Sequence, residues 1–183
     1  MIYDTSPQGH EVWKSIGRVN SVSAISADFL NLDGANQKIY KLKGSIFASG
    51  ASTTPNPVIQ LNGYSGASDY GVQISSVSGT TLTAYGSGAA NCVRIGNYGT
   101  SSHATVWEID LTIKSNWYGY SSVMGLSYCR DSATSTISVN QVFGNLQHSE
   151  DINRITLALW GSPAAGSTRV ELFTAGAPPA GTL

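Results

Sequence analysis

The sequence predicts an all-β protein built as a single antiparallel β-sandwich. Three observations predict this class. Apolar and polar residues alternate along many short segments, clusters of Gly, Ser, Asn and Pro separate those segments, and no stretch of ten or more residues has the spacing of an amphipathic helix. Many short strands at roughly regular spacing are typical of antiparallel sandwiches and barrels.

The clearest strand candidates have one apolar and one polar face. In TVWEIDLTI (105–113) every second residue is apolar, and Glu108 and Asp110 lie on the opposite face. In IYKLKGSIF (39–47) Tyr40, Leu42 and Ile46 share one face, and Lys41, Lys43 and Ser45 share the other. The segment 25–34 fits either one helical turn or a strand with a bulge. Further strand candidates are 13–22, 58–62, 80–85, 92–95, 119–129 and 136–143.

The chain of 183 residues fits one domain with a substantial core. We expect an N-terminal arm over 1–12, the sandwich domain over 13–173 and an extended tail rich in Pro, Gly and Ala over 174–183. In the last part of the domain, INRITLALWGSPAAGSTRVELF (152–173), apolar and polar residues alternate on both sides of a loop of Gly, Ser, Pro and Ala. This part is interpreted as a closing hairpin.

Composition argues against several function classes. Charged residues make up only 11% of the chain and the net charge is −1, against roughly 25% charged residues in an average soluble protein. This balance gives no case for a nucleic-acid partner. No apolar run of membrane-spanning length occurs, so no membrane insertion is expected, and the N-terminus lacks a signal-peptide pattern. Cys92 and Cys129 both lie in apolar runs, which favours two buried thiols and leaves a disulfide open.

Catalytic and metal-binding patterns are sparse, so we predict neither a metal, nor a cofactor, nor an enzymatic activity. The chain has no GxSxG elbow, and its Gly-rich segments lack the lysine of a phosphate loop. The acidic segment HSEDINR (148–154) suits either the start of a strand or a cation. No pair among the histidines has metal-ligand spacing. These histidines are His10, His103 and His148.

Aromatic residues in or beside the predicted loops are the remaining candidates for ligand binding. Their rings combine a flat apolar face with a polar edge, which suits stacking on sugars or packing at an interface. The alternative is that they are ordinary structural residues of a β protein, and that SNWYGY (115–120) only fixes a hairpin. The candidates are Tyr64, Tyr70, Tyr98, Trp117, Tyr118 and Tyr120.

The segment NRITLALWGSPAAGSTRVELF resembles the closing segment of a broad group of tailed-phage structural proteins. That group has a strand of the type I-x-x-I-x-L, a loop of Gly, Ala and Ser, and a final strand ending near an aromatic residue. The beginning is also similar, with an entrance strand over 13–22 and an apolar strand carrying Tyr40, so that the resemblance covers about 12–173. The matching positions at the end are Ile152, Ile155, Leu157, the loop Gly161–Gly166 and the strand Ser167–Phe173.

The resemblance implies a sandwich of jelly-roll type that is often trimeric and has no catalytic centre. We therefore expect a non-enzymatic structural protein on the surface of a tailed-phage virion, assembled in the bacterial host cytoplasm. Because no fibre shaft precedes the first strand, a capsid decoration or tail-associated subunit, a homotrimer in contact with other virion proteins, is the first hypothesis. The second is a receptor-binding tip that recognises host-surface glycans through loop aromatics. The third is a glycan depolymerase with paired carboxylates.

Overall fold

A computed structural model describes residues 13–21, 26–35, 39–49, 56–96, 103–112, 120–131, 137–160 and 165–175. Every regular element among these residues is a β-strand. The strands are β1 (Trp13–Ser21), β2 (Ser26–Phe29), β3 (Ile39–Ser49), β4 (Asn56–Leu61), β5 (Tyr70–Ser78), β6 (Thr81–Ala90), β7 (Val93–Arg94), β8 (His103–Thr112), β9 (Ser122–Asp131), β10 (Ile137–Leu146), β11 (Ile155–Trp160) and β12 (Ala165–Ala175).

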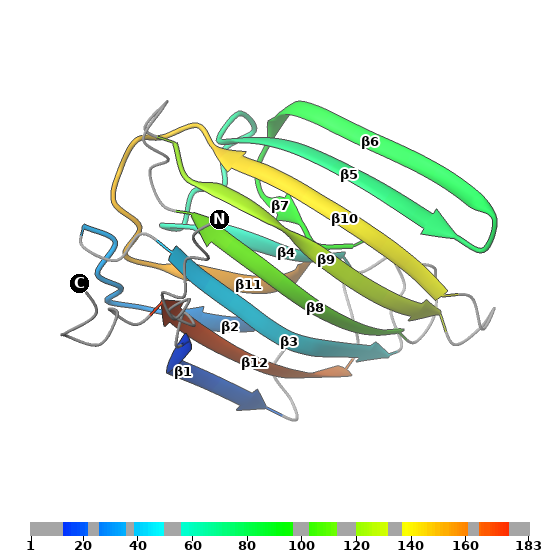
Figure 1. Cartoon of the computed structure of the whole chain (residues 1–183), viewed down its shortest axis with the longest axis horizontal. Helices are drawn as coiled ribbons and strands as arrows, with labels where there is room; N and C mark the ends of the chain where they lie inside the picture. The colour runs from blue at the N-terminus through cyan, green and yellow to red at the C-terminus, as the bar shows by residue number, and fades with distance from the viewer. Residues whose placement is uncertain are drawn as a thin grey trace, which may run out of the picture.

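The strands form two sheets in which every pair is antiparallel (Figure 1). The larger sheet has eight strands in the order β1-β12-β3-β8-β9-β10-β5-β6, and the smaller has four in the order β2-β11-β4-β7. The predicted all-β, antiparallel class is thus confirmed. No helix in the described part of the chain is long and apolar enough to cross a membrane.

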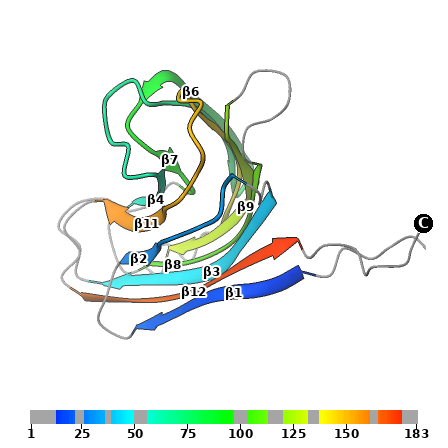
Figure 2. The ribbon, with the colours of Figure 1, turned by 90° about the vertical axis from the view of Figure 1, so that its left-hand side faces the viewer.

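One apolar core fills the space between the two sheets. The larger sheet curves around the smaller one (Figure 2), and alternation sends every second side chain of each strand inward. In β5, for example, Val72 and Ile74 are buried while Gln73 between them is exposed. The largest fully buried side chains are Tyr40, Tyr70, Leu42, Ile59, Leu61, Ile95, Leu146 and Ile152.

The predicted closing hairpin over 152–173 is wrong. Both strands exist, but β11 pairs with β2 and β4 in the smaller sheet, whereas β12 pairs with β1 and β3 in the larger one. The chain therefore crosses between the sheets in the loop that joins them. Alternation identifies a half-buried strand and its inward face, but it does not identify the neighbour to which the strand bonds.

Three smaller differences concern element boundaries. The segment 25–34 contains a strand, β2, and no helical turn. Strand β5 is absent from the prediction, because its serines and Gly71 give the segment the composition of a turn and make its apolar alternation less apparent. Strand β12 runs to Ala175, so the first two residues of the predicted tail belong to the sheet. The predicted arm over 1–12 and the rest of the tail lie outside the described residues.

Two glycines allow a close approach between segments. A Cβ built at Gly144 of β10 would lie 2.6 Å from a methyl group of Val93, so the missing side chain lets β7 reach the inner face of the larger sheet. At Gly34 a Cβ would lie 2.2 Å from the carbonyl oxygen of Ile152. Real Cβ atoms do not approach other atoms so closely, and both positions require glycine.

A polar chain crosses the core beneath β9 and β10. The Asn140 side-chain amide donates to the Ser127 hydroxyl over 3.1 Å, and this hydroxyl donates to the Ile95 carbonyl. All three residues are buried. The two cysteines are buried as expected, and no disulfide joins them. Burial raises the pKa of the Cys92 thiol to about 11, which keeps it protonated and unreactive at neutral pH.

Candidate functional site

The structure describes three of the six aromatic residues that the sequence suggests as candidate ligand contacts, namely Tyr64, Tyr70 and Tyr120. Tyr98, Trp117 and Tyr118 lie outside the described residues. Tyr120 immediately precedes β9, and 40% of its surface is exposed, so its ring is accessible. Tyr64 lies in the turn that joins β4 to β5, and Tyr70 is the first residue of β5 after that turn. The contacts described next show that both side chains stabilise the fold.

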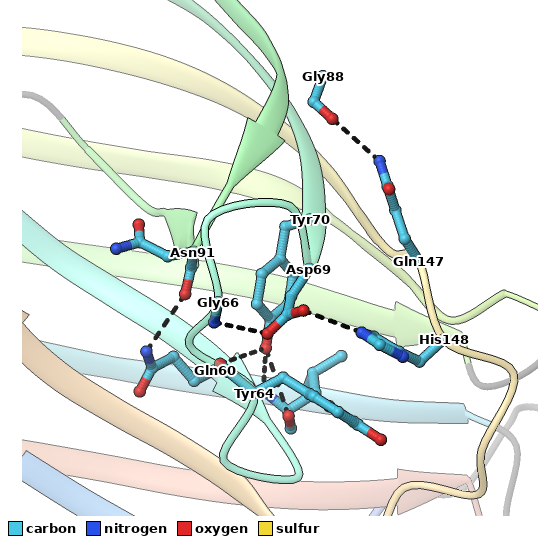
Figure 3. Close-up of polar contacts among 10 residues, drawn as sticks. Gln60, Tyr64, Gly66, Asp69, Tyr70, Gly88, Asn91, Gln147 and His148 are labelled. Carbon is cyan, nitrogen blue, oxygen red and sulfur yellow. Dashed lines mark hydrogen bonds and ion pairs between the residues drawn. The ribbon is translucent and has the colours of Figure 1, made fainter.

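Tyr70 is fully buried and does not offer its ring to a ligand, which corrects the prediction for this residue. Its hydroxyl accepts a hydrogen bond from the Leu61 amide at 2.7 Å and lies 3.2 Å from the Tyr64 carbonyl (Figure 3). Burial raises its pKa above the usual tyrosine value. Tyr70 was assigned to a loop because turn residues precede it, but it is the first residue of β5 and points into the core.

Tyr64 lies in a clasp that also contains Asp69 and His148. The rings of Tyr64 and His148 are stacked, with centroids 4.0 Å apart and planes 5° from parallel. His148 Nε2 lies 3.0 Å from Asp69 Oδ1, while Asp69 Oδ2 accepts from the Gly66 amide at 2.6 Å (Figure 3). The Gln147 amide donates to the Asp69 carbonyl at 2.8 Å. The clasp thus joins the β4–β5 turn to the segment that follows β10.

The electrostatics of the clasp agree with a structural role. The hydrogen bond from His148 and the one from the Gly66 amide lower the pKa of Asp69. The hydrogen bond to Glu150 raises the pKa of Tyr64. The Asp69 carboxylate and the His148 imidazole therefore bond to each other, the imidazole stacks on the Tyr64 ring, and the Tyr64 phenol bonds to Glu150. Within the described ranges, no group of three or more His, Cys, Asp and Glu residues could hold a metal ion, the acidic segment 148–154 included.

The outer face of the larger sheet carries a surface that the sequence alone did not predict. Here we call it the apolar half: the outward side chains of β9, β10, β5 and β6. Register aligns Tyr128, Val139, Val77 and Leu82 in one row across these four strands. All four side chains are exposed, Leu82 to 70%. The other exposed apolar members of this face are Met124, Leu126, Ile137 and Phe143.

The apolar half is large and almost without charge. Eight big apolar side chains at roughly 80 Å² of exposed area each present on the order of 600 Å², at the upper end of what a monomer normally exposes. Among the described outward residues of these strands, Arg130 is the only charged one. An open depression of about 360 Å³ lies beside Met124 and Phe143, over the side-chain-free position Gly71. Such a face favours another protein surface over water.

The signal for this face was present in the sequence. Strands β9 and β10 carry apolar residues at both parities: Val123 and Met124 are neighbours, as are Val142 and Phe143. A strand covered on one face only alternates, so two apolar faces indicate that both are covered. The pattern in 119–129 and 136–143 predicts strands, and the second apolar face is a finding of the structure.

The sequence matches no protein-family model and no curated protein.

Proposed function

We propose that this protein is a non-enzymatic structural subunit on the surface of a tailed-phage virion, a capsid decoration or tail-associated protein. In this proposal it is assembled in the bacterial host cytoplasm. Copies of the chain associate as a homotrimer by packing their apolar halves around a common axis, and other virion proteins contact the remaining faces. The apolar half is the observation that carries the proposal.

The strand order supports a jelly-roll sandwich. In that fold eight strands form a long double-stranded ribbon that rolls up, so that the first strand pairs with the last, the second with the seventh, and so on inward. When the hairpins β5–β6 and β9–β10 are set aside, the eight remaining strands pair in this way. The ribbon pairs are β1 with β12, β2 with β11, β3 with β8, and β4 with β7. Jelly rolls are common in viral capsid proteins, which agrees with the resemblance of the sequence.

The proposed contact between copies follows from area and charge. A standard interface buries about 800 Å² on each partner, and the apolar half together with its polar rim is of that order. Because the face is nearly uncharged, two copies approach without like-charge repulsion. The depression beside Met124 and Phe143 can receive a side chain from the neighbouring copy. A flat, uncovered apolar sheet face would otherwise promote aggregation.

The test uses the purified full chain, virions stripped of this protein, and host cells. We expect a sedimentation mass of three chains and saturable retention on virions. The double variant Tyr128→Lys/Val139→Glu should lose the trimer, because it places charges at two opposed positions of the apolar half. Lys43→Gln, on the outer face of β3, is the matched control and should behave as wild type. A wild-type protein that sediments as a monomer at all concentrations and is not retained on virions would overturn the proposal.

The second candidate is a receptor-binding module that recognises host-surface glycans. The exposed Tyr120 ring favours it, since Trp117 and Tyr118 lie within three residues of it in the sequence. Retention on host cells, competed by host polysaccharide and lost in Trp117→Ala or Tyr118→Ala without loss of folding, would support this candidate. Normal adsorption by both variants would contradict it.

A further inference from the structure

A cleft on the concave side of the larger sheet combines a cation with an aromatic ring and hydroxyl groups. It lies between the hairpin β5–β6 and the end of β7, and its volume is about 200 Å³. Ligand sites for drug-sized molecules measure roughly 300–1,000 Å³, so this cleft suits a single sugar-sized unit. Its lining includes Ile74, Ser76, Thr83, Tyr85, Arg94 and Gly96.

Arg94 is the charged group of the cleft. It is half-buried, and its guanidinium carbon lies 5.4 Å from the centroid of the Tyr85 ring. This cation–π contact holds the guanidinium beside the ring without using its N–H donors. Among the described residues no carboxylate pairs with Arg94 and no group accepts a hydrogen bond from it. A positioned, half-buried arginine with free donors is suited to bidentate recognition of a carboxylate.

The rest of the cleft offers hydroxyl groups and an apolar wall. Thr83 Oγ1 donates a long hydrogen bond of 3.5 Å to the Ser76 carbonyl and keeps its acceptor lone pairs. Ser76 itself is buried, and its side chain lines the cleft. Ile74, also buried, supplies apolar surface beside these polar groups. Sugars require this mixture, because each ring has an apolar face and a rim of hydroxyl groups.

We propose that the cleft binds one carboxylate-bearing sugar unit, a uronic acid or a similar acidic residue of a larger saccharide. Its carboxylate bonds to Arg94, its hydroxyl groups bond to Ser76 and Thr83, and its ring packs against Ile74 and the Tyr85 side of the cleft. The inference does not depend on the virion proposal. Ile74 and Ser76 point inward from β5, whereas the apolar half faces outward, so a sugar in the cleft does not compete with association of the copies.

The first experiment titrates the full chain with sodium glucuronate and follows backbone amide shifts by NMR. We expect saturable, millimolar binding with the largest shifts around β6 and β7. Glucuronamide, which keeps the shape but lacks the charge, and acetate, which keeps the charge but lacks the ring, should each bind at least tenfold more weakly. Equal binding of glucuronamide would contradict the role of Arg94, and equal binding of acetate would reduce the cleft to a general anion site and contradict the sugar assignment.

Variants locate the site. Arg94→Gln should weaken glucuronate binding at least tenfold, whereas Tyr85→Phe keeps the ring beneath the guanidinium and should change it less than threefold. The matched control is Arg130→Gln, which removes an exposed arginine from the opposite face and should bind as wild type. Glucuronate binding that survives Arg94→Gln, or shifts confined to residues far from the cleft, would overturn the proposal. If Arg94→Gln fails to fold, the comparison of glucuronate with glucuronamide on the wild-type protein decides alone.

Discussion

The outer face of the larger sheet is divided between two halves with opposite chemistry. On β1, β12, β3 and β8, which we call the charged half, one outward row in register reads Arg18, Glu171 and Lys43, alternating in sign, and Glu108 is the register partner of Lys43. Arg18 Nη2 and Glu171 Oε2 are 3.0 Å apart. Lys41 Nζ of the same half lies 4.7 Å from the ring centroid of Trp13. The next four strands continue the same sheet but carry the apolar half.

In the proposed assembly, this difference indicates which strands supply the contact between copies. The charged half belongs to strands of the proposed jelly-roll ribbon, and in it Arg18 of β1 pairs with Glu171 of β12 across the two strands. The apolar half lies entirely on the two additional hairpins, β5–β6 and β9–β10, whose described outward side chains include one charged group, Arg130. Among the described side chains of the charged half, the exposed large apolar residues are Ile16, Ile39 and Phe47. The two hairpins therefore enlarge the sheet and give it a contact face.

The strongest test of the comparison gives the apolar half the chemistry of the charged half. In Tyr128→Lys/Val139→Glu the new charges lie directly opposite one another in register, so they pair across β9 and β10 and the domain stays folded. Desolvating this pair at an interface is costly. We expect association to weaken at least a hundredfold, about 2.7 kcal/mol, in sedimentation equilibrium.

The control is Lys43→Gln/Glu171→Gln, which removes two opposed charges from the charged half. Its association constant should stay within threefold of wild type. Undiminished association of the first double variant, or equal losses in both, would show that the division of the outer face does not determine how copies meet.

The second test compares the buried tyrosines beneath the two halves. Tyr70 lies beneath the apolar half and its hydroxyl bonds to the Leu61 backbone. Tyr40 lies beneath the charged half, and among the described residues its hydroxyl has no hydrogen-bond partner. Burial, and to a lesser extent Asp33, raises its pKa to about 12. Tyr70→Phe should lower the free energy of unfolding by about 1–3 kcal/mol, since it leaves a buried amide unpaired.

Tyr40→Phe should instead be neutral or stabilising, because it removes a buried hydroxyl that makes no bond. Urea unfolding of both variants and wild type at pH 7 measures the difference. If Tyr40→Phe lowered the free energy of unfolding as much as Tyr70→Phe, the two buried hydroxyl groups would contribute equally, and the predicted difference between the two halves of the core would be wrong.

Much of this architecture follows from residue alternation alone. The period of two identifies most strands and the inward faces of β3 and β12, where Leu42 and Leu172 are fully buried. The period of two does not predict which strands pair. For a strand such as β11 the pattern indicates only that one face is buried, and the tertiary fold determines its neighbours. The same limit explains Tyr70, since local composition marks the turn before it but not the core that receives its ring.

The candidate surfaces were less predictable than the fold. The apolar half arises when β5 and β6, which precede β9 and β10 by many residues, join them through the pairing of β5 with β10. No local pattern places Val77 beside Val139. The cleft has the same origin, because Tyr85 and Arg94 meet only after β6 and β7 take their places in different sheets.

The third test concerns the clasp at the rim of the apolar half. His148, together with the Gly66 amide, lowers the pKa of Asp69. A carboxylate whose pKa is lower when folded stabilises the protein above its unfolded pKa of about 3.9, and this contribution is lost as the pH falls through the lower folded value. Asp69→Asn should therefore destabilise the protein at pH 7, and the difference from wild type should vanish near pH 2. Urea unfolding across this range measures it, and a difference that does not change with pH would contradict the electrostatic origin of the clasp.

The smallest effect is expected on the charged half, at Glu171. Its pKa is lowered first by a hydrogen bond from Ser15 and then by Arg18, and the Arg18 side chain is 61% exposed, so solvent screens the pair strongly. Glu171→Gln should destabilise the protein less than Asp69→Asn. Since the folded pKa is the lower one, the difference should be present at pH 7 and disappear as the pH falls below about 4.

One molar salt should reduce the part of this stabilisation that is due to Arg18, because the Debye length falls to about 3 Å. The same salt strengthens apolar contacts or leaves them unchanged, so association through the apolar half should persist. If salt instead dissociates the copies, charge pairs hold the assembly together and the roles assigned to the two halves must be exchanged.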